Sequence, residues 1–345
     1  MVTVGAVFAL QILLQPTLQS LSVSHGELVD ESGHRVALRG VCFSNWLAEK
    51  VPHSDADVRA VASMGANCIE ITVPFRLLDS GQGGLRDDGV AQIDRMLGYC
   101  RAVGTYAIIT CTAPESERTL ASDRATRVRF VETWVRLCGR YAAGDNANAS
   151  LVAIIPFEQP SRTLMDQRQY GDLCSYLATE LRKAAPGLLL FLAPLQGPGP
   201  EGAPMISYAN VGAVCRADAA AEQAQRDRTI EAAAMWAAQS GKPVLADRVA
   251  PPAGLATEER DSRLKATLAS LLGASPVISF LYDEYACASG PDGIGIRFAQ
   301  DGKLVRDEGL QALLSAGFRG KLAVPPPQNL PGAGGMPAET LAPES

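Results

Sequence analysis

Eight short apolar runs, separated by longer stretches of helix-forming composition, constrain the fold of this chain more than any other feature. Their apolar character is continuous rather than alternating, as in residues 188–192, which is typical of parallel strands buried on both faces. Eight strands alternating with helices predict an α/β fold, the (β/α)8 TIM barrel. The runs lie near residues 36–43, 67–73, 105–111, 151–157, 188–194, 211–215, 243–247 and 277–282.

The length of the chain favours one large domain over two. We expect the barrel at residues 24–320, because such a fold typically needs about 250 residues. One expected helix covers residues 229–238 and ends before Gly241-Lys242-Pro243, a sequence that stops helices. An apolar extension at residues 1–23 precedes the barrel, and a Pro/Gly-rich tail at residues 321–345 follows it.

Both ends of the chain differ from the barrel in composition. Residues 1–15 are apolar and uncharged, like the core of a signal peptide, but they lack a basic flank, so secreted and organellar locations both stay open. This run is also shorter than the about 20 residues that span a bilayer. The tail is expected to be disordered or bound to a partner.

Charge and cysteine content exclude several classes of function. The formal net charge is -6 and 20% of residues are charged, with no basic patch that would indicate nucleic-acid binding. The eight cysteines are spread singly, without a Cys-x-x-Cys pair, and are interpreted as mostly free structural thiols, with a disulfide framework or a metal site as the alternative. With three histidines, a zinc site has little support. We therefore expect no metal and no cofactor.

The tetrapeptide Phe157-Glu158-Gln159-Pro160 closes the fourth apolar run. It resembles the Asn-Glu-Pro motif that ends the fourth barrel strand of family-5 glycoside hydrolases, the cellulase family, and the resemblance extends over residues 26–318. In that family the Glu is the general acid/base. The register that keeps Pro160 puts Gln159 in its place, and an amide cannot donate a proton to a leaving glycosidic oxygen.

Other positions depart from the same family pattern. The resemblance places Arg248 where the family has its nucleophilic Glu, and a guanidinium has no nucleophilic oxygen. Glu70 stands where the family has an Arg, Cys215-Arg216-Ala217 take the place of a His-x-Tyr, and Asp283 takes the place of a Trp. The resemblance therefore implies a degenerate member that lacks both catalytic glutamates.

Compared with the family pattern, the positive and the negative charge have changed places: Glu70 stands where the family has its Arg, and Arg248 stands where the family has its nucleophilic Glu. Because an unpaired buried charge costs several kcal/mol, we expect an ion pair between them, shared with Glu158. The alternative is that these side chains face solvent at the rim of the barrel.

Three functions are consistent with this pattern. The first is a catalytically inactive barrel that serves as a structural or interaction subunit, with protein partners held through the extension and the tail. The second is a carbohydrate-binding protein, with Trp46 and Tyr285 as aromatic platforms and the charged Glu70, Glu158 and Arg248 beside them. The third is a β-glycan hydrolase with displaced carboxylates, for which the candidates are Glu158, Asp247 and Asp283. Regular strand alternation would turn Asp247 away from the face of Arg248.

Overall fold

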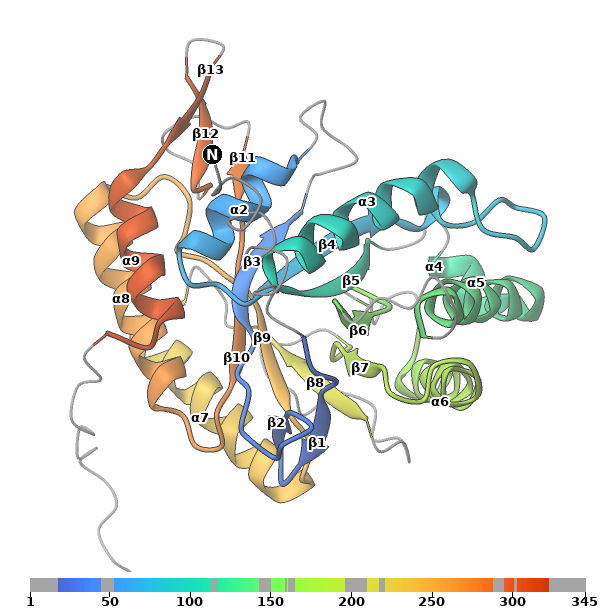
Figure 1. Ribbon diagram of the computed structural model, residues 1–345. Helices are drawn as coiled ribbons and strands as arrows, with labels where there is room; N and C mark the ends of the chain where they lie inside the picture. The colour runs from blue at the N-terminus through green and yellow to red at the C-terminus, as the bar shows by residue number, and fades with distance from the viewer. Residues whose placement is uncertain are drawn as a thin grey trace, which may run out of the picture.

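The computed structural model is a closed barrel of eight parallel strands surrounded by helices (Figure 1). It describes residues 18–44, 53–112, 117–142, 150–158, 160, 165–195, 210–216, 221–287, 295–300 and 303–322. Around the barrel the strand order is β10-β3-β4-β5-β6-β7-β8-β9, so each strand lies beside its neighbour in the chain. The strands are β3 (Arg39–Phe43), β4 (Cys68–Pro74), β5 (Tyr106–Thr112), β6 (Leu151–Ile155), β7 (Leu189–Leu192), β8 (Val211–Cys215), β9 (Val244–Val249) and β10 (Ser279–Tyr282). The predicted (β/α)8 fold is confirmed.

Amphipathic helices cover the outside of the barrel. The helix expected at residues 229–238 is the central part of α7, which ends at Gly241 in the left-handed conformation that favours glycine. Within the described ranges, no helix combines the length and apolar character needed to cross a membrane. The helices are α2 (Asp55–Ser63), α3 (Asp87–Val103), α4 (Glu117–Ser122), α5 (Arg124–Ala142), α6 (Gln167–Ala184), α7 (Gln223–Ser240), α8 (Thr257–Gly273) and α9 (Glu308–Phe318), with a 3-10 helix, η1 (Phe75–Leu77).

Two small sheets lie outside the barrel wall. The hairpin of β1 (Ser22–Ser24) and β2 (Glu27–Val29) brings the buried Leu21 and Leu28 into the apolar cluster that fills the barrel interior. A sheet of β11 (Ala286–Cys287), β12 (Arg297–Gln300) and β13 (Lys303–Arg306) is inserted between β10 and α9. The barrel interior is thus a packed core rather than a channel.

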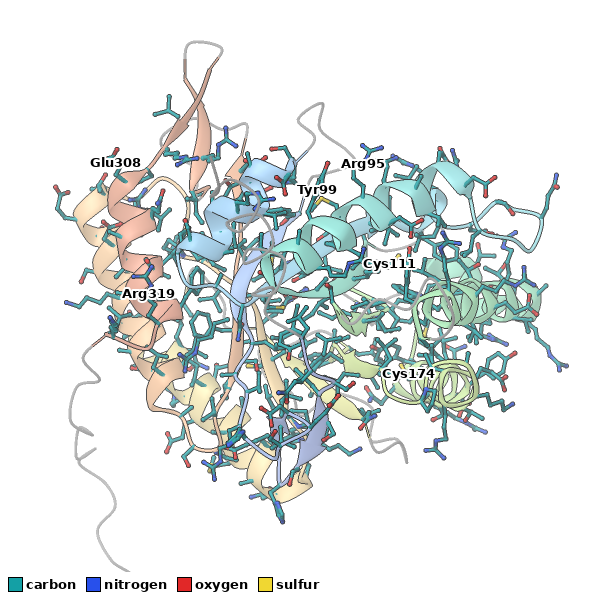
Figure 2. All side chains as sticks on the ribbon, in the orientation of Figure 1. Arg95, Tyr99, Cys111, Cys174, Glu308 and Arg319 are labelled. Carbon is teal, nitrogen blue, oxygen red and sulfur yellow. The ribbon has the colours of Figure 1, made fainter. Side chains whose placement is uncertain are left out.

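The cysteines behave as small hydrophobic residues. The seven thiols described by the structure are free and buried, which confirms the expectation for these positions. Cys111 in β5 and Cys174 in α6 lie inside the molecule, whereas Arg95 of α3 and Glu308 of α9 are on its outside (Figure 2).

Gly40 marks the closest approach of two barrel strands. A Cβ atom at Gly40 in β3 would lie 1.7 Å from the carbonyl oxygen of Cys68 in β4. We expect Gly40→Ala to lower the free energy of unfolding by about 3 kcal/mol, measured by urea unfolding, because two strands must separate. Gly98→Ala is the matched control: it lies in α3 with nothing within 4 Å of the new atom, and it should stabilise by up to about 1 kcal/mol. Equal stability of the Gly40 variant and wild type would contradict this strand spacing.

Candidate functional site

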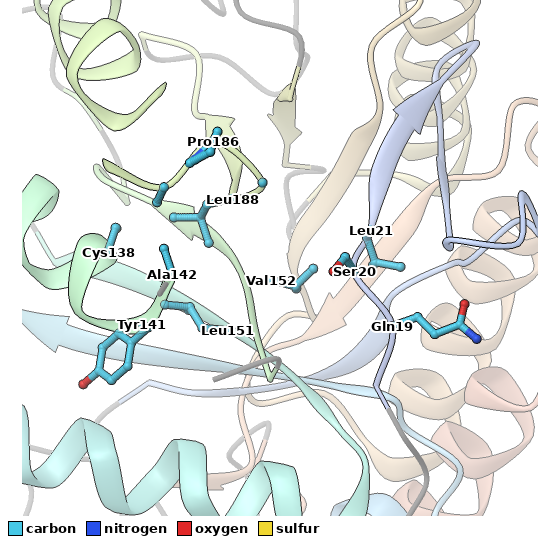
Figure 3. Close-up of a pocket in the computed structure, with 12 residues that line it drawn as sticks. Gln19, Ser20, Leu21, Cys138, Tyr141, Ala142, Leu151, Val152, Pro186 and Leu188 are labelled. Carbon is cyan, nitrogen blue, oxygen red and sulfur yellow. The ribbon is translucent and has the colours of Figure 1, made fainter. Parts of the chain in front are cut away.

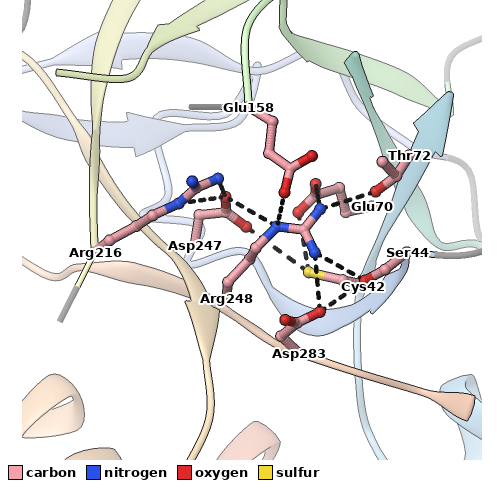
Figure 4. Close-up of polar contacts among 9 residues, drawn as sticks. All are labelled: Cys42, Ser44, Glu70, Thr72, Glu158, Arg216, Asp247, Arg248 and Asp283. Atoms are coloured by element: carbon pink, nitrogen blue, oxygen red, sulfur yellow. Dashed lines mark hydrogen bonds and ion pairs between the residues drawn. The ribbon is translucent and has the colours of Figure 1, made fainter. Parts of the chain in front are cut away.

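Nine polar side chains meet at the carboxyl ends of the barrel strands (Figure 4). This end of a TIM barrel carries the active site in characterised enzymes, because the strand ends converge there. The nine are Cys42 of β3 and Ser44 just after it, Glu70 and Thr72 of β4, Glu158 after β6, Arg216 after β8, Asp247 and Arg248 of β9, and Asp283 after β10.

The guanidinium group of Arg248 occupies the centre of this cluster. Its Nε lies 3.1 Å from Glu158 Oε1, and its Nη1 lies 3.0 Å from Asp283 Oδ1. Its Nη2 lies 3.5 Å from Glu70 Oε1. Burial opposes the charge of Arg248, but Glu70 and Asp247 outweigh burial and raise its pKa. These distances confirm the predicted contact between Glu70 and Arg248, and they show that Arg248 also contacts Glu158 as predicted.

Two hydroxyl groups fix the plane of the guanidinium. Arg248 Nη1 donates to Ser44 Oγ at 2.9 Å, and Nη2 donates to Thr72 Oγ1 at 3.1 Å. Ser44 in turn donates to Asp283 Oδ1 at 2.7 Å. With only 13% of its side chain exposed, Arg248 is held from several strands at once.

A bulge in β9 brings two consecutive side chains into the cluster. Ala246 pairs with Phe280 and Val249 pairs with Tyr282, so Asp247 and Arg248 together oppose one residue of β10. Arg248 has a φ of 55°, in the left-handed region, which is uncommon for a residue other than glycine. The expectation that strand alternation turns Asp247 away from the face of Arg248 is therefore wrong.

Glu70 is fully buried at the bottom of the cluster. The thiol of Cys42 donates to its Oε2 at 3.0 Å. Burial and the neighbouring Asp247 raise the pKa of Glu70 to about 8, although Arg248 acts in the opposite direction. Burial and Asp247 thus favour the protonated form of Glu70, whereas Arg248 favours its ionised form.

Asp247 is the ionised member of the buried carboxyl groups. Its Oδ2 accepts from Arg216 Nη2 at 2.6 Å and from Arg216 Nε at 3.3 Å. Burial favours the neutral form, but Arg216 and Arg248 outweigh burial and lower the pKa of Asp247 to about 2. The role of Arg216 was not predicted from the sequence, although this arginine directly follows the sixth apolar run.

Glu158 and Asp283 are the carboxylates of the cluster that solvent reaches. Their side chains are 20% and 21% exposed, whereas those of Glu70 and Asp247 are fully buried. Burial raises the pKa of Glu158, and Arg248 and Arg216 partly oppose this shift. Both exposed carboxylates face the same guanidinium, so each is neutralised in part by Arg248.

Three groups of the cluster have the chemistry of metal ligands. Cys42 Sγ and one oxygen from each of Glu70 and Asp247 lie within 4.8 Å of one another. However, two cationic side chains already occupy this position, since Asp247 is bonded to Arg216 and Arg248 Nε lies 3.9 Å from it. We therefore assign no metal to this group.

Tyr285 is not a sugar platform, contrary to the expectation. Its side chain is 2% exposed, because its ring packs against Phe43 and His53. Its hydroxyl donates to Asp57 Oδ1 at 3.1 Å, and Asp57 also pairs with Arg297 of β12. Tyr285 thus tethers the small sheet to α2. The other proposed platform, Trp46, and the motif residue Gln159 lie outside the described residues.

A separate cavity of about 330 Å³ lies at the amino end of the barrel (Figure 3). It is lined by the segment from Gln19 to Leu21, by the end of α5, and by the residues before β7. The start of β6 contributes Leu151 and Val152. Since these residues precede the barrel strands, the cavity is not part of the polar cluster at the other end.

Comparisons with known proteins agree with the resemblance seen in the sequence. Residues 29–149 match the family model "Cellulase (glycosyl hydrolase family 5)", which confirms that resemblance. No curated protein sequence matches this chain significantly.

Solved structures share the fold over most of the chain. Endogalactoceramidase has a TM-score of 0.74 at 15% identity, over 86% of this chain and 85% of its own. The cellulose synthase subunit Z from Clostridioides difficile has a TM-score of 0.68 at 14% identity, over 81% and 99%. The hyperthermophilic endocellulase from the archaeon Pyrococcus horikoshii has a TM-score of 0.66 at 13% identity, over 88% and 100%. At these identities the similarity concerns the fold alone.

Proposed function

We propose that this chain is a cellulase-type barrel without family-5 hydrolytic activity, which serves as a structural or interaction subunit. The observation that supports this most strongly is the guanidinium group of Arg248 at the centre of the polar cluster, where the family resemblance expects a carboxylate nucleophile. A retaining glycosidase needs two carboxyl groups about 5–5.5 Å apart, one as nucleophile and one as acid/base. Arg248 cannot act as that nucleophile.

The remaining carboxylates do not replace the missing pair. Asp247 is fully buried and bonded to Arg216, so a sugar ring cannot reach it. Glu158 and Asp283 are partly exposed, but each contacts Arg248 at 3.0–3.1 Å. The two carboxylates that solvent reaches therefore share one cation, Arg248, as their ion-pair partner. The geometry therefore favours a rigid charge cluster over a displaced active site.

A hydrolysis assay tests the loss of activity directly. Wild-type protein, Glu158→Gln and the surface control Glu132→Gln are incubated with soluble β-glucans and β-mannans, and released reducing ends are measured. We expect no turnover above the buffer blank for any of the three. Turnover by wild type and by the control that Glu158→Gln abolishes would contradict the proposal and identify Glu158 as a displaced catalytic acid.

Binding and assembly measurements separate the remaining functions. Affinity electrophoresis in gels that contain the same polymers would detect glycan binding. A glycan-binding barrel should migrate more slowly in these gels without releasing reducing ends. The subunit role predicts instead that the native complex containing this chain shrinks when residues 324–345 or residues 1–22 are removed. An unchanged complex after both truncations would remove the support for partner binding through the two ends.

A further inference from the structure

Two buried carboxyl groups lie close together in the cluster. The side chains of Glu70 and Asp247 are both buried, and one carboxyl oxygen of each lies within 4.8 Å of the other. Two ionised carboxylates this close repel each other in a region that water does not reach, and neither has a hydrogen to donate to the other. Their burial and spacing therefore favour one carboxylic acid beside one carboxylate.

The surrounding charges decide which group holds the proton. Asp247 accepts two hydrogen bonds from Arg216, the shorter at 2.6 Å, and these stabilise its ionised form. Glu70 has no such partner: its nearest cation is Arg248 Nη2 at 3.5 Å, and its Oε1 is buried without a hydrogen bond. The proton therefore lies on Glu70.

The groups that face Glu70 come from every neighbouring strand of the cluster. The cluster contains four carboxyl groups, those of Glu70, Glu158, Asp247 and Asp283, and two guanidinium groups. If all four carboxyl groups were ionised, the cluster would carry an excess of two negative charges. The buried proton reduces this excess to one. Beyond the four carboxylates, the titratable or charged neighbours are Cys42 of β3, Cys68 of β4, Arg216 after β8 and Arg248 of β9.

We propose that the proton on Glu70, beside the ionised Asp247, is a pH-sensitive switch in the barrel: the cluster is closed while Glu70 holds this proton and loosens when the proton leaves. Removal of this proton places two ionised carboxylates side by side in a region that water does not reach. The resulting repulsion acts on β4 and β9, the strands that carry them. This inference does not depend on whether the barrel cleaves or binds glycans.

Glu70→Gln tests the switch, because an amide has the shape and the donor of a neutral carboxylic acid but cannot ionise. The folded form of Glu70 keeps its proton to about pH 8, whereas the unfolded chain loses it near pH 4.5. Between these values the folded state holds the extra proton, so stability falls as pH rises. Relative to the variant, the unfolding constant of wild type should rise roughly tenfold per pH unit between about pH 5 and 7.5.

Urea unfolding of wild type and Glu70→Gln across this pH range measures the ratio, with EDTA present to exclude metal ions. Glu132→Gln, on the exposed face of α5, is the matched control and should give a constant ratio. A constant ratio for Glu70→Gln would overturn the proposal. So would a pH profile of wild type that changes when Zn²⁺ replaces EDTA, because a metal rather than a proton would then hold the pair.

Infrared spectroscopy gives a second readout that needs no variant. Protein labelled with 13C-glutamate should show the carbonyl stretch of a protonated carboxyl group at pH 7, shifted by the isotope. The band should disappear reversibly between pH 7 and 9.5 while the circular dichroism stays native. Absence of the band at pH 7 would overturn the assignment even if Glu70→Gln failed to fold.

Discussion

Replacing Arg248 by Met should lower the free energy of unfolding by about 3–5 kcal/mol at pH 7, the largest loss that we expect from a single substitution in this barrel. Met keeps the length and much of the flexibility of the arginine side chain. What it removes is the cation that contacts Glu158 at 3.1 Å and Asp283 at 3.0 Å. Those carboxylates would then remain partly buried without the cation that contacts both of them, and breaking a buried pair by removing one partner is strongly destabilising.

Arg59→Met is the matched control for this measurement. Arg59 also contacts a carboxylate, Asp55, at 2.7 Å, but its side chain is 58% exposed. An exposed pair contributes about 0–1 kcal/mol, so this variant should unfold almost as wild type does in urea. The loss at Arg248 should also shrink at acidic pH, because protonation neutralises the carboxylates left behind. Equal losses at Arg248 and Arg59 would show that the cluster does not need its central cation.

The barrel strands could be predicted because their burial on both faces leaves a simple sequence pattern. The run at residues 211–215 coincides with β8, and the run at residues 105–111 differs from β5 by one residue at each end. The run at residues 36–43 starts before β3, because Leu38 is buried inside the barrel without belonging to the strand. Continuous apolar character reports burial, whereas strand ends depend on hydrogen bonds that the pattern does not show.

The site was harder to predict because it depends on a local irregularity. Asp247 and Arg248 reach the same face only through the bulge in β9, and no glycine marks its left-handed residue. The pairing of Arg216 with Asp247 had a usable signal in the sequence, because the two residues stand at the carboxyl ends of successive apolar runs. In the structure Cys215 pairs with Ala246, so the next residues of these neighbouring strands lie side by side. Tyr285 failed as a sugar platform because its position in the sequence does not reveal that Phe43, His53 and Arg297 pack around its ring.

Asp247→Asn should lower the free energy of unfolding by about 3 kcal/mol at pH 7, because it removes the ionised partner of Arg216 and a neighbour of Arg248. The pKa of Asp247 is lowered to about 2 in the folded protein, from 3.8. A lowered carboxyl pKa stabilises the folded state above pH 3.8, and that contribution is lost as the pH falls toward 2. The difference between wild type and variant should therefore shrink by about 2 kcal/mol between pH 5 and 2.

The same substitution also changes the behaviour of Glu70. An amide at position 247 removes the negative charge that opposes ionisation of Glu70, while Arg248 stays 3.5 Å from it. Glu70 should then lose its proton at a lower pH, and the stability of the variant should vary less with pH between about 5 and 7.5 than that of wild type. Urea unfolding at pH 2.5, 4, 5.5 and 7.5 measures both effects, with Asp55→Asn in the exposed pair on α2 as the control. A loss that is the same at every pH would mean that Asp247 contributes shape rather than charge, and that the cluster is held together without the ion pair to Arg216.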